Sequence, residues 1–184
     1  MGLTTHPKTL DPTRVSVRNL QRKISVDVAE LEGFAVNAVK RCLQLQKRKR
    51  TKLRKLNAVT VRLISDRRIS KLHLQIFGDS DPTDVITFHD GEIFISVETA
   101  RRNARKFCNS LTSEVKFCMV HGFLHLHGFD DHMPADRRKM KNTQEKILGG
   151  MGIRIGIIPK GKQEKTKKLK QYVQAQHPRT RIVT

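Results

Sequence analysis

The segment from Leu111 to Gly128 constrains the fold of this chain more than any other part of the sequence. Its apolar residues recur at helical spacing, at Leu111, Val115, Cys118, Met119, Gly122 and Leu126. A helix with such a face has to be covered by other elements, so we expect a central helix. Ser113 is a candidate N-cap, and Gly128 ends the pattern just after His127.

Half of the chain's eight histidines lie in the stretch HGFLHLHGFDDH, residues 121–132. Because residues four apart share one face of a helix, His121 and His125 can offer two imidazoles to one metal ion. After the glycine turn, the chain can supply a third ligand from Asp130, Asp131 or His132. Three protein ligands and a fourth position open to water are typical of a catalytic zinc site. The pattern therefore predicts a metal centre at the end of this helix.

The residue after His121 argues against a metallopeptidase. Zinc peptidases with the HExxH pattern carry a glutamate there as general base, whereas this chain has Gly122. A metal ion can still lower the pKa of a bound water. His127 faces another side of the helix, and we expect no ligand role for it.

The chain is strongly basic, with 37 Lys and Arg residues against 17 Asp and Glu residues and a formal net charge of +20. Such a charge favours a polyanionic partner, either nucleic acid or an anionic membrane surface. Together with the predicted metal centre, it points to hydrolysis of a phosphodiester backbone. The chain has no Trp and one Tyr, so any stacking of bases on aromatic side chains would depend on Phe.

A basic run lies between residues 47 and 55. It is either a solvated helix end and loop or a phosphate-binding patch, and the total charge favours the patch. Its basic residues are Lys47, Arg48, Lys49, Arg50, Lys52, Arg54 and Lys55.

Cysteine usage and hydropathy exclude several classes of protein. Cys42, Cys108 and Cys118 are widely spaced, which argues against a disulfide framework and fits a reducing compartment. No run of apolar residues is long enough to cross a membrane, and residues 1–13 lack the apolar stretch of a secretory signal.

The remaining pattern predicts one domain over residues 14–158. Residues 1–13 read as a flexible leader, and residues 159–184 as a basic tail that is disordered or orders on a partner. Strands are expected at 14–18, 58–64, 85–88 and 92–97. Further helices are expected at 28–46, 66–76, 97–107 and 135–148.

Two motifs at compatible spacing resemble the YbeY family of bacterial single-strand endoribonucleases. HGFLHLHGFDDH is similar to that family's HGxLHLxGxDH signature. PTDVITF (82–88) followed by GEIFIS (91–96) resembles its PTDVLSF and GDIxIS block. The resemblance covers roughly residues 14–156, including VSVRN near the start, and leaves out the leader and the tail.

The resemblance implies an α/β (α+β) fold with a small mixed sheet surrounded by helices. It implies one Zn²⁺ per chain, held by three histidines in a cleft, and no small-molecule cofactor. It also implies a cytoplasmic enzyme that acts on single-stranded rRNA with the small ribosomal subunit as partner, in 16S 3′-end processing and ribosome quality control. No membrane association is expected.

The sequence departs from the family pattern at two places. The family's third histidine aligns with Asp131, which we favour as the ligand because it keeps the spacing, with His132 as the alternative. Phe77 stands where the family has an arginine, and His73 where it has an asparagine. We therefore expect no catalytic residue beyond the metal site, and we expect His73 on the helix surface or lining the site. The loss of the arginine leaves an alternative, a non-catalytic ribosome-binding assembly factor with a structural metal.

Overall fold

The computed structural model describes residues 14–45, 51–154, 156 and 182–183. The predicted leader, most of the predicted basic tail and residues 46–50 lie outside these ranges. The domain boundaries therefore stay predictions.

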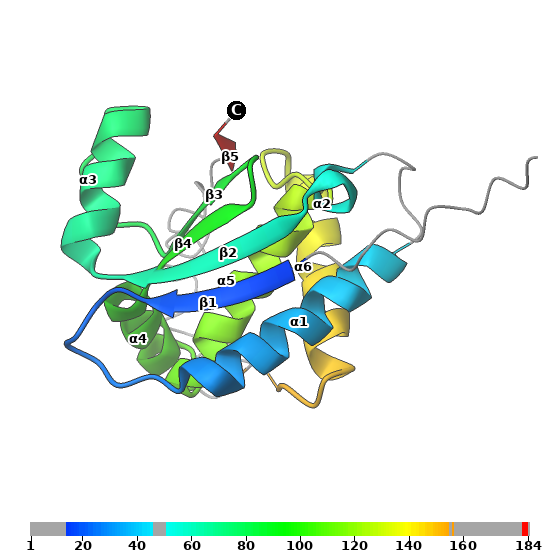
Figure 1. Ribbon diagram of the computed structural model, residues 1–184, viewed down its shortest axis with the longest axis horizontal. Helices are drawn as coiled ribbons and strands as arrows, with labels where there is room; N and C mark the ends of the chain where they lie inside the picture. Colours follow the sequence, from blue (N-terminus) through cyan, green and yellow to red (C-terminus); the bar gives the residue numbers. More distant parts are fainter. Residues whose placement is uncertain (1–13, 46–50, 155, 157–181, 184) are drawn as a thin grey trace, which may run out of the picture.

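A mixed sheet forms the centre of the fold, with strand order β1-β2-β4-β3-β5 (Figure 1). Its strands are β1 (Arg14–Asn19), β2 (Ala58–Ile64), β3 (Val85–Phe88), β4 (Glu92–Ser96) and the two-residue β5 (Ile182–Val183). β1, β2 and β4 run parallel, β3 is antiparallel to β4, and β5 is parallel to β3. The predicted α+β fold with a small mixed sheet is confirmed.

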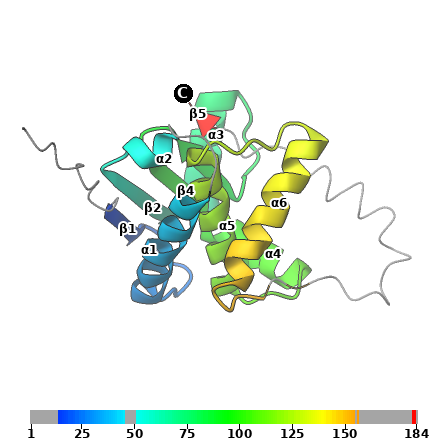
Figure 2. The same cartoon turned by 90° about the vertical axis from the view of Figure 1, so that its right-hand side faces the viewer.

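Most helices lie on one side of this sheet, where α1, α4, α5 and α6 are layered (Figure 2). The six helices of the described residues are α1 (Val28–Gln44), α2 (Lys52–Lys55), α3 (Asp66–Phe77), α4 (Val97–Lys106), α5 (Leu111–Leu126) and α6 (Pro134–Gly149). Alternate strand residues such as Val61, Leu63 and Ile93 are fully buried against this layer. The other face of the sheet carries only a small apolar cluster with α3, formed by Ile64, Ile69 and Ile86.

α5 is the central helix that its apolar pattern predicts. It contacts α1, α4, α6 and the hairpin strands β3 and β4. Most of its residues are buried, including Phe123, Leu124 and Met119. No helix in the described ranges combines the length and the apolar character that a membrane span requires.

Three local features differ from the sequence expectation. Ser110, not Ser113, caps α5, because its Oγ accepts a hydrogen bond from the backbone N–H of Ser113 at 3.0 Å. The helix α2 inside the basic run is not expected from the sequence; it begins after Thr51, whose Oγ1 accepts from the backbone N–H of Arg54 at 3.4 Å. The short strand β5 is not expected either.

Candidate metal centre

A glycine allows α5 to pack tightly against the sheet beside the first histidine. A Cβ atom at Gly122 would lie 2.9 Å from Ile93 Cδ1 and 3.0 Å from Thr87 Oγ1. Both distances are shorter than ordinary van der Waals contact, so position 122 faces the sheet with no room for a larger side chain. The glutamate of an HExxH peptidase would therefore point into the core and away from a metal ion, which agrees with the sequence argument against proteolysis.

His121 and His125 lie one turn apart on α5 with their ring nitrogens facing each other. Their Nε2 atoms are 3.1 Å apart. Asp131 Oδ2 lies 3.6 Å from His121 Nε2 and 3.9 Å from His125 Nε2. These three residues form a group whose potential ligand atoms all lie within 4.8 Å of one another.

Hydrogen bonding sets which nitrogen of His125 can accept a metal ion. Its Nδ1 lies 3.2 Å from the carbonyl oxygen of Phe129 and can only donate a proton there. Nε2 therefore keeps its lone pair and points it at His121 and Asp131. Burial is the main reason that the pKa of His125 is lowered to about 4, so the ring is neutral at neutral pH, as a metal ligand must be.

The turn after α5 brings Asp131 back to the two histidines. Gly128 has a φ of 88°, and the backbone N–H of Phe129 donates to the carbonyl of Leu124 at 3.0 Å. The Asp130 carboxylate then accepts from the backbone N–H groups of Asp131 and His132, at 2.7 and 3.1 Å. The chain direction after the turn is thus set by one bond between backbone groups and by two bonds from the backbone to the Asp130 carboxylate.

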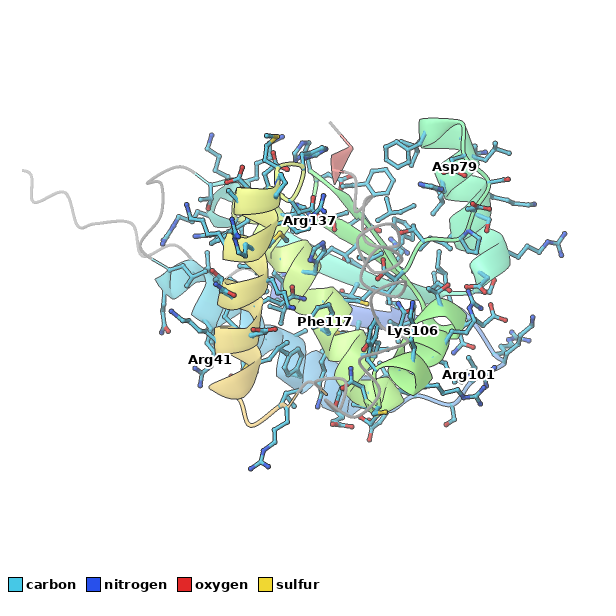
Figure 3. All side chains as sticks on the ribbon, turned by 180° about the vertical axis from the view of Figure 1, so that it is seen from behind. Arg41, Asp79, Arg101, Lys106, Phe117 and Arg137 are labelled. Carbon is cyan, nitrogen blue, oxygen red and sulfur yellow. The ribbon has the colours of Figure 1, made fainter. Side chains whose placement is uncertain are left out.

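Arg137, near the start of α6, holds the same loop from its other side (Figure 3). Its Nε donates to the carbonyl of Asp131 at 3.1 Å. Burial raises the pKa of Asp131, and the nearby Asp130 charge acts in the same direction, whereas His132 and Arg137 oppose it. A cation beside this carboxylate would favour its ionised form.

His132 has a different environment from Asp131. It is exposed, and its Nδ1 forms a short contact with the carboxylate of Asp130. This contact is the main reason that the pKa of Asp130 is lowered. The geometry thus brings Asp131 to the two histidines, whereas His132 belongs to a more exposed group with Asp130 and Asp131.

The donor set of His121, His125 and Asp131 fits a divalent metal ion. Two imidazole nitrogens and one carboxylate oxygen lie within 4.8 Å of one another, and the contact between the two Nε2 atoms needs either a shared proton or a cation. Such a set is suited to Zn²⁺, and the carboxylate also makes Mn²⁺ or Fe²⁺ acceptable.

Part of the predicted basic patch lies close to this end of α5. Lys52, Arg54 and Lys55 are on α2, which contacts α5. A guanidinium nitrogen of Arg54 donates to the carbonyl of Leu43. The other predicted patch residues, Lys47, Arg48, Lys49 and Arg50, lie outside the described ranges.

His127, the next histidine after His125, is buried and does not belong to the group formed by His121, His125 and Asp131. His127 stacks on Phe129, with ring centroids 6.2 Å apart. Burial lowers its pKa, and the charge of Arg54 acts in the same direction.

The two positions that depart from the family pattern lie together on α3. His73 is buried, so its interpretation as a surface residue is wrong; it lies one turn after Ile69 on the inner side of the helix. Its ring meets Phe77 edge-on at 5.2 Å, and its Nδ1 lies 4.0 Å from Asp79 Oδ2. Neither His73 nor Phe77 belongs to a metal-ligand group of the described residues.

Comparison with known proteins finds one family. A family model described as Endoribonuclease YbeY matches residues 16–152. The Endoribonuclease YbeY of Carboxydothermus hydrogenoformans is 32% identical over 146 residues, covering 74% of this chain and 96% of that protein. The protein of the same name from Pelotomaculum thermopropionicum is 30% identical over 154 residues, covering 76% and 97%.

Some matches are shorter, and one concerns a solved structure. The Endoribonuclease YbeY of Streptococcus mutans is 40% identical over 79 residues, and the chain spans about half of that relative, 48% of its length. A solution structure of a protein from Thermotoga maritima superimposes with a TM-score of 0.50 at 26% identity, covering 74% of this chain and 91% of that one.

Proposed function

Because this chain belongs to the YbeY family of endoribonucleases, we propose that it is a metal-dependent hydrolase that cleaves single-stranded RNA during rRNA maturation. The observation that carries the proposal is the convergence of His121, His125 and Asp131 at the end of a buried helix. The proposed substrate is rRNA at the 16S 3′ end, and ribosome quality control belongs to the same proposal. We place this action in the cytoplasm, on the small ribosomal subunit.

In this proposal His121, His125 and Asp131 hold one Zn²⁺ per chain. When bound, the ion supplies a Lewis acid that polarises a phosphate oxygen and lowers the pKa of water. His125 is held in the required tautomer by the Phe129 carbonyl. The Asp131 carboxylate offsets one of the two charges of the ion, and its burial keeps bulk water from competing for it.

The phosphate backbone needs positive charge from elsewhere, because Phe77 offers none. We propose that Lys52, Arg54 and Lys55 on α2 bind the phosphates of the substrate, together with Lys47, Arg48, Lys49 and Arg50 of the same run. The contact of α2 with α5 supports this role.

A cleavage assay tests the proposal directly. Purified protein is incubated with single-stranded and duplex RNA, with and without a chelator, beside His121→Ala. We expect chelator-sensitive cleavage of the single strands that His121→Ala abolishes. His132→Ala is the matched control, since its ring is exposed and paired with Asp130, and it should cleave at close to the parental rate. Cleavage by His121→Ala at the parental rate would exclude this metal centre as the source of activity.

The alternative of a non-catalytic assembly factor is not favoured, since relatives that match over nearly their whole length are endoribonucleases. The assembly factor and the enzyme differ in one measurable outcome. A folded, metal-loaded protein without turnover that sediments with small subunits, even as His121→Ala, would support it in place of the enzyme.

A further inference from the structure

The sheet has a second face that the helical layer leaves open (Figure 1). Phe88 and Phe94 pack at the margin of the small cluster with α3 and stay partly exposed, and most of the remaining side chains on this face are polar or charged. Strand alternation places on it Arg14, Ser16, Arg18, Thr60, Arg62, Phe88, Glu92 and Phe94. A face of this composition is not needed to close the core.

The strand register aligns these side chains in rows across the sheet. Arg18 lies opposite Arg62, Arg62 opposite Phe94, and Phe94 opposite Ile86. In the neighbouring row, Ser16 pairs with Thr60 and their hydroxyl oxygens are 3.4 Å apart. One row therefore runs from two arginines to an aromatic ring.

The aromatic part of this face is a pair of partly exposed rings. Phe88 and Phe94 meet edge to face, with centroids 5.5 Å apart and planes at 72°. The guanidinium carbon of Arg62 lies 5.9 Å from the centroid of Phe94, and Arg62 is held there by two contacts to Glu92. The ring positions are thus fixed from two sides.

The charge on this face is positive. Arg14, Arg18 and Arg62 outnumber Glu92, which Arg62 already neutralises. Arg18 is exposed and forms no ion pair with any residue of the described ranges. Because Arg62 is already paired with Glu92, the positive charge that remains for a ligand on this face comes from the exposed Arg14 and Arg18, and it favours a negatively charged ligand over an apolar protein surface.

We propose that this open sheet face is a binding platform for single-stranded RNA. Bases stack on Phe94 and Phe88, and the phosphates lie against Arg18 and Arg14. Aromatic side chains on an open sheet bind single strands because every base offers a flat π-face, and nearby arginines track the backbone. The proposal rests on RNA being the substrate, and adds a second surface that holds it.

The platform and the candidate metal group lie on opposite faces of the sheet, and β3 contributes to both sides. Thr87 and Phe88 are neighbours on β3 and therefore point to opposite faces of the sheet. Thr87 faces Gly122, the residue after His121, whereas Phe88 belongs to the platform. RNA held on Phe88 and Phe94 is thus kept near the strand that supports the catalytic helix.

Binding of RNA is measured without cleavage by using His121→Ala as the parent in the presence of a chelator. The probe is a fluorescently labelled single-stranded RNA of about 12 nucleotides, longer than the shortest binding sites known for such platforms, and the readout is fluorescence anisotropy. Phe94→Leu should raise the Kd at least about fivefold, because it removes the stacking surface and keeps an apolar side chain. Phe94→Tyr keeps a ring and should bind within about twofold of the parent.

Phe117→Leu is the matched control, since Phe117 is a partly buried phenylalanine on α5, in the helical layer. It should leave the Kd unchanged. A second readout covers the case in which Phe94→Leu fails to fold: the parent is crosslinked to RNA containing 4-thiouridine, and the labelled peptides are mapped. We expect crosslinks in the peptides that contain Phe88 and Phe94.

Two outcomes overturn the platform. One is a Phe94→Leu protein that is folded and binds RNA as the parent does; the other is crosslinking confined to other elements. Both can occur while the enzyme still cleaves RNA, so failure of the platform is distinguishable from failure of the proposed function. Binding that depends on Phe94 in a protein without cleavage would instead support the platform alone.

Discussion

At the scale of single residues, Asp131 and His132 are the two candidates for the third ligand of the proposed metal centre. Asp131 is buried within 4 Å of both histidines, whereas His132 is exposed and paired with Asp130. We predict that Asp131→Asn weakens binding of Zn²⁺ at least about tenfold, since it removes the anionic donor. Isothermal titration calorimetry on metal-free protein measures this change.

The control for that measurement is His132→Ala, for which we expect an affinity within about twofold of the parent, since its ring is exposed and pairs with Asp130 instead. The reverse ranking, with His132→Ala weaker than Asp131→Asn, would assign the third position to His132. Sequence spacing alone leaves this choice open, because it depends on how Asp130 caps the backbone of the loop after Gly128.

Gly122 carries a second prediction at this scale. Gly122→Glu should destabilise the protein by at least about 3 kcal/mol, because the new side chain meets Ile93 and Thr87 and buries a charge. Chemical denaturation followed by circular dichroism measures the loss. Gly33→Glu is the matched control, since Gly33 is exposed on α1 and a Cβ there meets nothing within 4 Å. An equal loss in both variants would contradict the close packing of α5 on the sheet.

At the scale of elements, Asp66 ties the start of α3 to β4 and α4. Its carboxylate accepts hydrogen bonds from Ser96, Thr99 and Arg102. Burial alone would raise the pKa of Asp66, but these three bonds and the charge of Arg102 outweigh it, and the pKa is lowered. A lowered pKa means that the stabilisation is complete above the ordinary value of 3.8 and disappears as the pH falls through the folded-state pKa.

Asp66→Asn should therefore cost about 1 to 2 kcal/mol at pH 7, and the difference from the parent should shrink below pH 3.8. Urea denaturation at a series of pH values measures it. Asp81→Asn, at an exposed aspartate, should follow the parent at every pH. A difference for Asp66→Asn that stays constant down to about pH 2 would rule out the ionised carboxylate as its source.

Helices and strands with a periodic apolar pattern could be predicted from the sequence. Elements that depend on a few contacts, or on contacts between distant parts of the chain, could not. Residues 58–64 and 85–88 form strands with the predicted bounds; the first alternates between buried and more exposed residues, and the second is a short apolar run buried at its first three positions. The cap of α5 differs from the expected one, since Ser110 and Ser113 both suit a cap and the helix begins one turn earlier than expected, at Leu111. Helix α2 is a single turn without periodicity, and β5 depends on pairing with β3 across about half of the chain.

At the scale of the whole molecule, the net charge of +20 is spread along the chain and includes the charge of its last 25 residues. Residues 160–184 carry eight Lys and Arg residues and one Glu. If these residues bind phosphates, a protein without them displaces fewer counterions from the RNA when it binds. Its affinity should then depend less on the salt concentration. Deletion of these residues also removes the two-residue strand β5, so the dependence of affinity on salt, and not the affinity alone, identifies the phosphate contacts.

We therefore predict that deletion of residues 160–184 weakens binding of single-stranded RNA and lowers the slope of log Kd against log salt concentration, by roughly 0.7 for each phosphate that the shortened protein no longer neutralises. The measurement is a titration of His121→Ala, with and without the deletion, at several salt concentrations. Lys139→Ala on the exposed part of α6 serves as a control for removal of a single charge. An unchanged slope would assign the basic tail a role other than phosphate binding, and the charge that holds RNA would then have to come from α2 and the open sheet face.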